Sequence, residues 1–121
     1  MAAPNIVAVA TITGKTIGAA LTTTSADIVT NSAASGKVLK INAIYIANVD
    51  GTNNVDATVR FYDASVSSGT AFALANTITV PADATLDILS KPIYLEEGDK
   101  IQGLASANSD AEIVVSYEEI S

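Results

Sequence analysis

The sequence predicts an all-β protein, an antiparallel β-sandwich with a jelly-roll-like arrangement of about eight to ten short strands. Three observations lead to this prediction. Apolar and polar residues alternate along most of the 121-residue chain, as they do in half-buried strands. Clusters of turn-forming residues interrupt this alternation about every 8–12 residues. No segment carries the apolar spacing of an amphipathic helix.

The first expected element is a β-hairpin near the N-terminus. Residues 5–13 are rich in Val and Ile, which favour strands. The pair Gly14-Lys15 is expected to form the turn, and residues 16–22 are expected to return as the partner strand. A short strand over residues 26–30 follows.

Residues 37–49 form the clearest predicted strand. One face would carry Leu39, Ile41, Ala43, Tyr45, Ala47 and Val49. The other face would carry Val38, Lys40, Asn42, Ile44, Ile46 and Asn48. Both faces hold apolar residues near the middle, so we expect a central strand. The turn formers at residues 50–54 and the alternation over residues 55–62 then predict a hairpin with this strand.

The remaining strands are expected over residues 71–80, 85–95, 100–106 and 111–120. Proline cannot donate a backbone hydrogen bond, so Pro81 should end the first of these and Pro92 should interrupt the second. Turns are expected at residues 96–99 and 108–110. One face of the last strand should carry Ile113, Val115 and Tyr117.

The composition excludes several function classes. The chain has no His, Cys or Trp, so the usual neutral-pH base, thiol chemistry, disulfides and His/Cys metal sites are missing. The net charge of −7 disfavours nucleic acid and anionic membranes as partners. No stretch approaches the length of a membrane-spanning helix, and the N-terminus lacks the basic region of a secretory signal. One domain is expected over residues 1–121, with residues 1–4 as a flexible arm.

Two Gly-Lys pairs resemble the end of a phosphate-binding P-loop. That motif needs a second Gly five residues earlier, where the chain has Val9 before Gly14 and Asn31 before Gly36. It also needs a following helix, whereas residues 16–22 read as a strand. There is no Gly-x-Ser-x-Gly elbow and no His to activate a hydroxyl. We therefore predict a protein that is not an enzyme and that needs no cofactor.

The loop over residues 50–56 places oxygen-bearing side chains at alternate positions: Asp50, Thr52, Asn54 and Asp56. Calcium prefers such hard ligands, but the loop lacks the Gly and the terminal Glu of an EF-hand. Asp-Gly and Asn-Asn are also ordinary turn residues. We predict no metal site and interpret this loop as a structural turn, with calcium binding as the open alternative.

The acidic clusters are predicted to be structural rather than catalytic. Glu96 and Glu97 are adjacent and point to opposite faces, so they cannot face each other across a cleft as glycosidic chemistry requires. They are interpreted as part of a solvated hairpin whose amides Asp99 can cap. Glu118 and Glu119 are interpreted as a solvated tail or as a contact for a basic partner.

Aromatic residues are few, which limits the case for a sugar-binding platform. The six rings belong to Tyr45, Phe61, Tyr62, Phe72, Tyr94 and Tyr117. Phe61 and Tyr62 are adjacent, so only one can enter the core. An exposed Tyr62 favours a subunit-interface anchor over a ligand platform.

Several segments together resemble small virion proteins of tailed bacteriophages, especially those of cyanobacteria and other aquatic bacteria. The segments lie at residues 5–16, 36–51, 80–86, 93–101 and 115–120. These segments resemble that family in residue type and in their order along the chain, and they include no active-site motif. The resemblance implies a β-sandwich that binds an assembled shell as a symmetric oligomer, without catalytic residues.

This resemblance implies a capsid decoration (cement) protein that binds the outside of the phage head and stabilises it. The expected partners are the major capsid protein and further copies of the chain, as a trimer or a dimer. The expected location is the capsid surface of the virion, after assembly in the host cytoplasm. Residues 6–12 are the predicted contact element. The alternatives are a head-fibre, tail or baseplate module, or a carbohydrate-binding module for host recognition.

Overall fold

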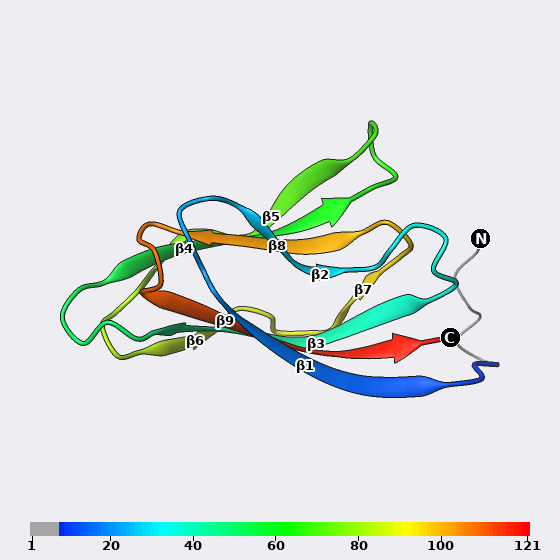
Figure 1. Ribbon diagram of the computed structural model, residues 1–121, viewed down its shortest axis with the longest axis horizontal. Coiled ribbons are helices and arrows are strands. Elements are labelled where there is room, and N and C mark those ends of the chain that lie inside the picture. The colour runs from blue at the N-terminus through cyan, green and yellow to red at the C-terminus, as the bar shows by residue number, and fades with distance from the viewer. Residues whose placement is uncertain (1–7) are drawn as a thin grey trace.

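A computed structural model describes residues 8–121, which form nine strands in two antiparallel sheets that pack face to face (Figure 1). The prediction of an all-β antiparallel sandwich is confirmed. The described residues contain no α-helix, and so none that is long and apolar enough to span a membrane.

The first sheet, sheet A, has the strand order β1-β9-β3-β6, and β7 also pairs with β3. Its strands are β1 (Ile12–Ala20), β3 (Val38–Asn48), β6 (Thr85–Asp87), β7 (Ile93–Leu95) and β9 (Ala111–Ile120). Sheet B has the order β2-β8-β4-β5. Its strands are β2 (Ala26–Thr30), β4 (Val55–Asp63), β5 (Thr70–Val80) and β8 (Lys100–Ala105). Only the β4–β5 and β6–β7 connections stay within one sheet, and all others cross between the sheets.

The predicted hairpin turn at Gly14-Lys15 is wrong. Strand β1 runs straight through both residues and pairs along its whole length with β9, from Ile12 opposite Ile120 to Ala20 opposite Glu112. Gly14 permits a turn but does not require one, and the C-terminal strand supplies a complete set of hydrogen-bond partners. Residues 1–7, which include the predicted arm and the first three residues of the first predicted strand, lie outside the described residues.

The predicted hairpin between β3 and β4 is also wrong, because the two strands lie in different sheets. The connection crosses the edge of the sandwich and is held by Asn48, whose side chain is 3% exposed. Its Nδ2 donates to the carbonyls of Asn53 at 2.9 Å and Val80 at 3.0 Å, and its Oδ1 accepts from the Asp50 N–H at 2.9 Å. These bonds replace the ladder that a hairpin would have formed.

The two predicted faces of β3 are corrected by a β-bulge between Ile41 and Ala43. The extra residue, Asn42, shifts the alternation by one. Odd-numbered residues therefore face the core before the bulge, and even-numbered residues face the core after it. Ile41 precedes the bulge and Ile44 follows it, yet both are fully buried in the same core. As predicted, β3 is central, between β9 on one side and β6 with β7 on the other.

The turn at residues 96–99 connects β7 in sheet A to β8 in sheet B, so the predicted hairpin there is wrong. Asp99 is 3% exposed and is not solvated. Its Oδ2 accepts from the Glu96 N–H at 3.0 Å, which confirms the predicted cap. Its Oδ1 accepts from the Ala64 N–H at 3.0 Å and ties the turn to the end of β4. Gly98 has a φ of 92°, which a side chain would disfavour.

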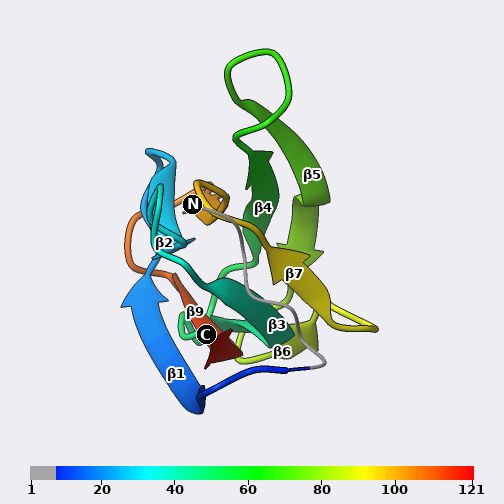
Figure 2. The same ribbon diagram turned by 90° about the vertical axis from the view of Figure 1, so that its right-hand side faces the viewer.

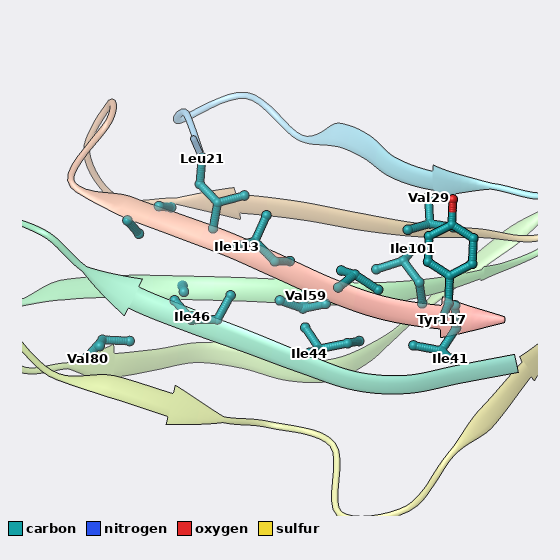
Figure 3. Close-up of a cluster of buried hydrophobic side chains, with 14 of the residues drawn as sticks. Leu21, Val29, Ile41, Ile44, Ile46, Val59, Val80, Ile101, Ile113 and Tyr117 are labelled. Atoms are coloured by element: carbon teal, nitrogen blue, oxygen red, sulfur yellow. The ribbon is translucent and has the colours of Figure 1, made fainter. Parts of the chain in front are cut away.

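The core lies between the sheets and is built from aliphatic side chains of both (Figure 3). Its fully buried large residues include Ile44, Ile46 and Ile113 from sheet A and Val59 and Ile101 from sheet B. The face predicted for the last strand is confirmed, and its members Ile113, Val115 and Tyr117 are all buried. In the described residues every buried side-chain nitrogen and oxygen has a hydrogen-bond partner.

Candidate interaction surfaces

Strand β1 forms one edge of sheet A, and half of its backbone groups point away from the molecule. Thr11 and Ser121 exchange two backbone hydrogen bonds of 3.0 and 2.9 Å, and the Leu21 N–H donates to Ala111 at 2.8 Å. The β1–β9 register between these points has no shift. Alternate residues of an antiparallel edge strand bond inward, so the residues between them present N–H and C=O groups outward. These outward groups, called the open edge below, belong to Ile12, Gly14, Thr16, Gly18 and Ala20.

The open edge lacks the usual features that protect a strand from pairing. Within β1 there is no Pro, no bulge and no residue with positive φ. Its one charged side chain, Lys15, is drawn back over β9, where its Nζ lies 3.2 Å from Glu119 Oε1. Lys37 Nζ lies 3.5 Å from the same oxygen. Figure 2 shows β1 at the lower rim of the sandwich with β9 as its neighbour.

The opposite flank, formed by β5, β6 and β7, is interrupted. The β4–β5 register shifts twice, and Thr77 in β5 has a φ of 47°. The Thr77 N–H donates to the buried Thr58 hydroxyl at 3.0 Å, which removes it from any new ladder. Strands β6 and β7 have three residues each, and Pro92 lies directly before β7. Such an edge does not template pairing.

The β4–β5 hairpin projects beyond the rest of the sandwich (Figures 1 and 2). Residues 61–72, called the hairpin arm below, carry two large apolar side chains that are exposed: Val66 and Phe72, the latter 48% exposed. Phe72 lies opposite Phe61, which is half-buried and packs against the core. Directly paired residues share a face, so Phe72 extends the core-facing side of sheet B to a place where sheet A does not cover it.

Tyr62 sits under the tip of the hairpin arm rather than standing free as a platform. It is half-buried, and the Lys100 Nζ lies 5.1 Å from its ring centroid. A Cβ added to Gly69 would clash with the Tyr62 hydroxyl, so a larger residue at position 69 would require the Tyr62 side chain to move. Gly69 also has a φ of 110°. The interpretation of Tyr62 as a subunit-interface anchor stays a prediction.

The outer face of sheet A carries two of the exposed rings. Tyr45, 40% exposed, lies directly opposite the exposed Val114 of β9. Tyr94 is also exposed and lies opposite Lys40, five residues away from Tyr45 along β3. The two rings therefore stand apart and do not form a joint stacking platform.

The loop over residues 50–56, for which calcium binding was the open alternative, uses carboxylate oxygens for turn hydrogen bonds. Asp50 Oδ1 accepts from the Thr52 N–H at 2.8 Å and from the Asn53 N–H at 3.3 Å. The bond from Thr52, followed by those from Asn53, lowers the pKa of Asp50. Asp56 Oδ1 accepts from the Thr79 hydroxyl at 2.9 Å, away from Asp50. No group of three or more acidic side chains in residues 8–121 is arranged to hold a metal ion.

The acidic pairs are also engaged within the chain. Glu97 Oε2 accepts from the Gly36 N–H at 2.8 Å, so the second Gly-Lys pair belongs to a loop contact. Glu118 accepts from the Asn42 side chain at 3.1 Å. Glu119 contacts two lysines of its own chain, as described above. Both C-terminal glutamates lie within β9, so they do not form a free tail.

Sequence reasoning missed the two features that distinguish this surface, the open edge and the hairpin arm. The sequence contains a signal for the edge: residues 12–20 have no Pro and only one charged residue. The alternation of apolar and polar residues gives no signal for the arm. Phe72 lies at a position in that alternation which normally faces the core, and it is exposed only because sheet A does not extend over it.

The sequence matches no protein-family model and no curated protein. Among solved structures it is similar to a subunit of the Bacillus endospore appendages, described as a novel family of disulfide-linked pili. The two share 20% identity over 89% of this chain and 85% of that chain, with a TM-score of 0.51. A chain of the T13 IBDV viral particle gives 12% identity over 93% of this chain and 31% of that chain, with a TM-score of 0.44. The first likeness shows a shared fold.

Proposed function

We propose that this protein is a structural subunit of a virion, a decoration protein that binds the outside of a tailed-phage head and stabilises it. The resemblance of its segments to small phage virion proteins supports this proposal. So does the alternation of strands between a five-stranded sheet, β1-β9-β3-β6 with β7 also on β3, and a four-stranded sheet, β2-β8-β4-β5, because double-sheet domains of the jelly-roll kind occur in viral capsids. The pilus subunit of like fold is also an assembling protein. This chain has no Cys and would assemble without disulfides.

The hairpin arm is the observation that carries the proposal. Phe72 and Val66 expose apolar surface. Both belong to the hairpin that projects from the sandwich (Figure 2), where a partner can reach them. A few side chains contribute most of the energy at protein interfaces, and aromatic residues, Phe among them, are enriched at the centre of such interfaces. A repeated shell multiplies a modest contact of this size by holding many copies on one lattice.

The test is binding of the full chain to purified phage heads that lack it. Phe72→Ser should weaken binding by about thirtyfold, as expected for the loss of an aromatic anchor of about 2 kcal/mol. Val49→Ser is the matched control, because Val49 is 51% exposed but lies in the β3–β4 connection, outside the arm. Co-sedimentation with the heads measures both. Equal occupancy of the shell by the Phe72→Ser variant and the parent chain would rule out the arm as the contact.

The N-terminal segment is the second proposed contact with the shell. Within residues 6–12, only residues 8–12 are described, and Ile12 is exposed at the start of β1. Deletion of residues 1–12 should abolish shell binding. Full occupancy after the deletion would refute this part of the proposal and leave the arm unaffected.

A carbohydrate-binding module is the rival from a different class, and a head-fibre, tail or baseplate module is the rival within the virion. The exposed Tyr45 and Tyr94 favour testing the first, although they stand apart on sheet A. A glycan array with the full chain would show binding that Tyr45→Ala removes if that function holds. Immunogold labelling of intact virions separates head from tail locations.

A further inference from the structure

We propose that the open edge of β1 pairs antiparallel with β1 of a second copy of this chain, around a two-fold axis at Thr16. This inference rests on the proposed function only in that it names the partner of the expected homo-oligomer. It predicts a dimer in which the two copies of sheet A become one continuous sheet.

The first argument is the spacing of the outward backbone groups, which belong to every second residue of β1. A two-fold axis at Thr16 places Thr16 opposite its own copy, Gly14 opposite Gly18 and Ile12 opposite Ala20. All five residues belong to the open edge, so every facing pair can exchange two backbone hydrogen bonds. In a register shifted by one residue, each open-edge residue would face a residue whose N–H and C=O groups already bond to β9. None of these pairs of hydrogen bonds would then form.

The second argument is the fit of the side chains in this register. Gly14, Thr16, Gly18 and Ala20 place small groups on the outer face, and the one large side chain there, Ile12, lies opposite the small Ala20. The only charged residue of β1, Lys15, lies opposite Ile17 of the second copy and not opposite its own equivalent. The alkyl stem of Lys15 can pack on that Ile17 while its ammonium stays 3.2 Å from Glu119.

The third argument concerns which strand can serve as the partner. Strand β2 has five residues and a register shift between Asp27 and Val29. Strand β5 is bulged and carries the positive φ of Thr77. Strands β6 and β7 have three residues each. Among the edges in the described residues, only β1 offers nine residues in unbroken phase, so its best match is another β1.

The symmetry has a consequence for assembly. A strand that pairs with its own copy forms an isologous contact, which closes at two subunits and leaves both hairpin arms free. Each dimer therefore presents two arms to a larger partner, and the dimer contact and the arm contact use separate residues.

Sedimentation velocity on the full chain tests the inference. The parent chain should sediment as a dimer, and Thr16→Pro should raise the dimer dissociation constant by about tenfold or more, because it removes the central donors and leaves acceptors unpaired. The N–H of Thr16 does not bond to β9, so this variant should keep its circular dichroism spectrum. A parent chain that sediments as a monomer or a trimer, or a Thr16→Pro variant that dimerises like the parent, would overturn the inference.

A charge pair tests the register independently of folding. Thr16→Lys and Thr16→Glu each place like charges opposite each other at the axis and should dimerise several-fold more weakly than the parent. An equimolar mixture of the two should form heterodimers more tightly than either variant forms homodimers. No preference for the heterodimer would exclude this register.

Hydrogen exchange identifies the strand that pairs. In a dilute monomer, the amides of Gly14, Thr16 and Gly18 should exchange quickly, while those of Lys15 and Ile17 are protected by β9. In the dimer both sets should be protected. Unchanged exchange at Gly14 and Gly18 upon dimerisation would place the dimer contact elsewhere, and shell binding by the same Thr16→Pro sample shows whether the proposed function fails with it.

Discussion

On one flank of the sandwich, β1 runs as a straight edge strand of nine residues with no bulge and no proline. On the other flank, β5 is bulged, and the edge beside it is broken into two strands of three residues. Both flanks close the same core, so packing does not demand this difference. An edge that is kept regular can accept another strand, whereas an interrupted edge resists pairing. The difference indicates which flank can be an interface.

Substitution of the asparagine that secures the interrupted flank should have the largest effect on stability. Asn48→Leu leaves the carbonyls of Asn53 and Val80 and the N–H of Asp50 without their partner, and we expect a loss of about 3 kcal/mol in the free energy of unfolding. Urea denaturation measures it. Asn54→Ala is the control, because Asn54 makes a single exposed bond of 3.3 Å to the Ala82 N–H. Equal losses for both variants would contradict the role given to Asn48.

The hairpin arm on the same flank should show an intermediate effect. Gly69→Ala places a methyl group against the Tyr62 hydroxyl at a positive φ, and we expect a loss of about 2 kcal/mol together with weaker shell binding. Gly51→Ala is the matched control, because its new Cβ would lie 3.5 Å from the nearest Asp83 oxygen, an ordinary contact. Thermal unfolding compares the two variants. An unchanged melting temperature for Gly69→Ala would show that the tip does not pack closely against Tyr62.

A substitution on the flank formed by β1 and β2 should give the smallest effect on stability, because the polar side-chain contacts there are exposed. Hydrogen bonds from Gln102 at 2.9 Å and Lys100 at 3.1 Å lower the pKa of Asp27 in β2. A lowered carboxyl pKa stabilises the fold above the ordinary pKa of Asp, and this contribution is lost as the pH falls through the lowered value. The gap in stability between the parent and Asp27→Asn should be about 0.3 kcal/mol at pH 7 and vanish at low pH. Urea titrations from pH 7 to about pH 2 measure it, and a gap that widens on acidification would reverse the assigned sign.

The sequence predicted which residues form strands much better than which strands pair. Alternation placed β2, β3, β4, β8 and β9 almost at their observed bounds, because a half-buried strand shows its period locally. It could not show that the Asp50 turn crosses between sheets, because the same turn residues serve hairpins and crossings alike. The partner of β1 lies about a hundred residues away at β9, and no local pattern encodes such a pairing.

The candidate surfaces were predictable only in part. The sequence led us to expect residues 6–12 as a contact with a partner, but it did not place an open edge over residues 12–20. Which residues of β1 point their backbone groups outward depends on the hydrogen bonds between Thr11 and Ser121, and only the three-dimensional register reveals these bonds. The bulge at Asn42 reversed the predicted faces of half of β3, because one extra residue inverts every later side chain.

The pairing of the first described strand with the last sets the order of events during synthesis. On a translating ribosome, β1 emerges early and stays without its neighbour until residues 111–120 have left the exit tunnel. Sheet A therefore closes only after translation has passed its final strand, and folding is governed by contacts that are distant in sequence and slow to form. Until then both sides of β1 are unpaired, so the nascent chain is most prone to aggregate before residues 111–120 have emerged.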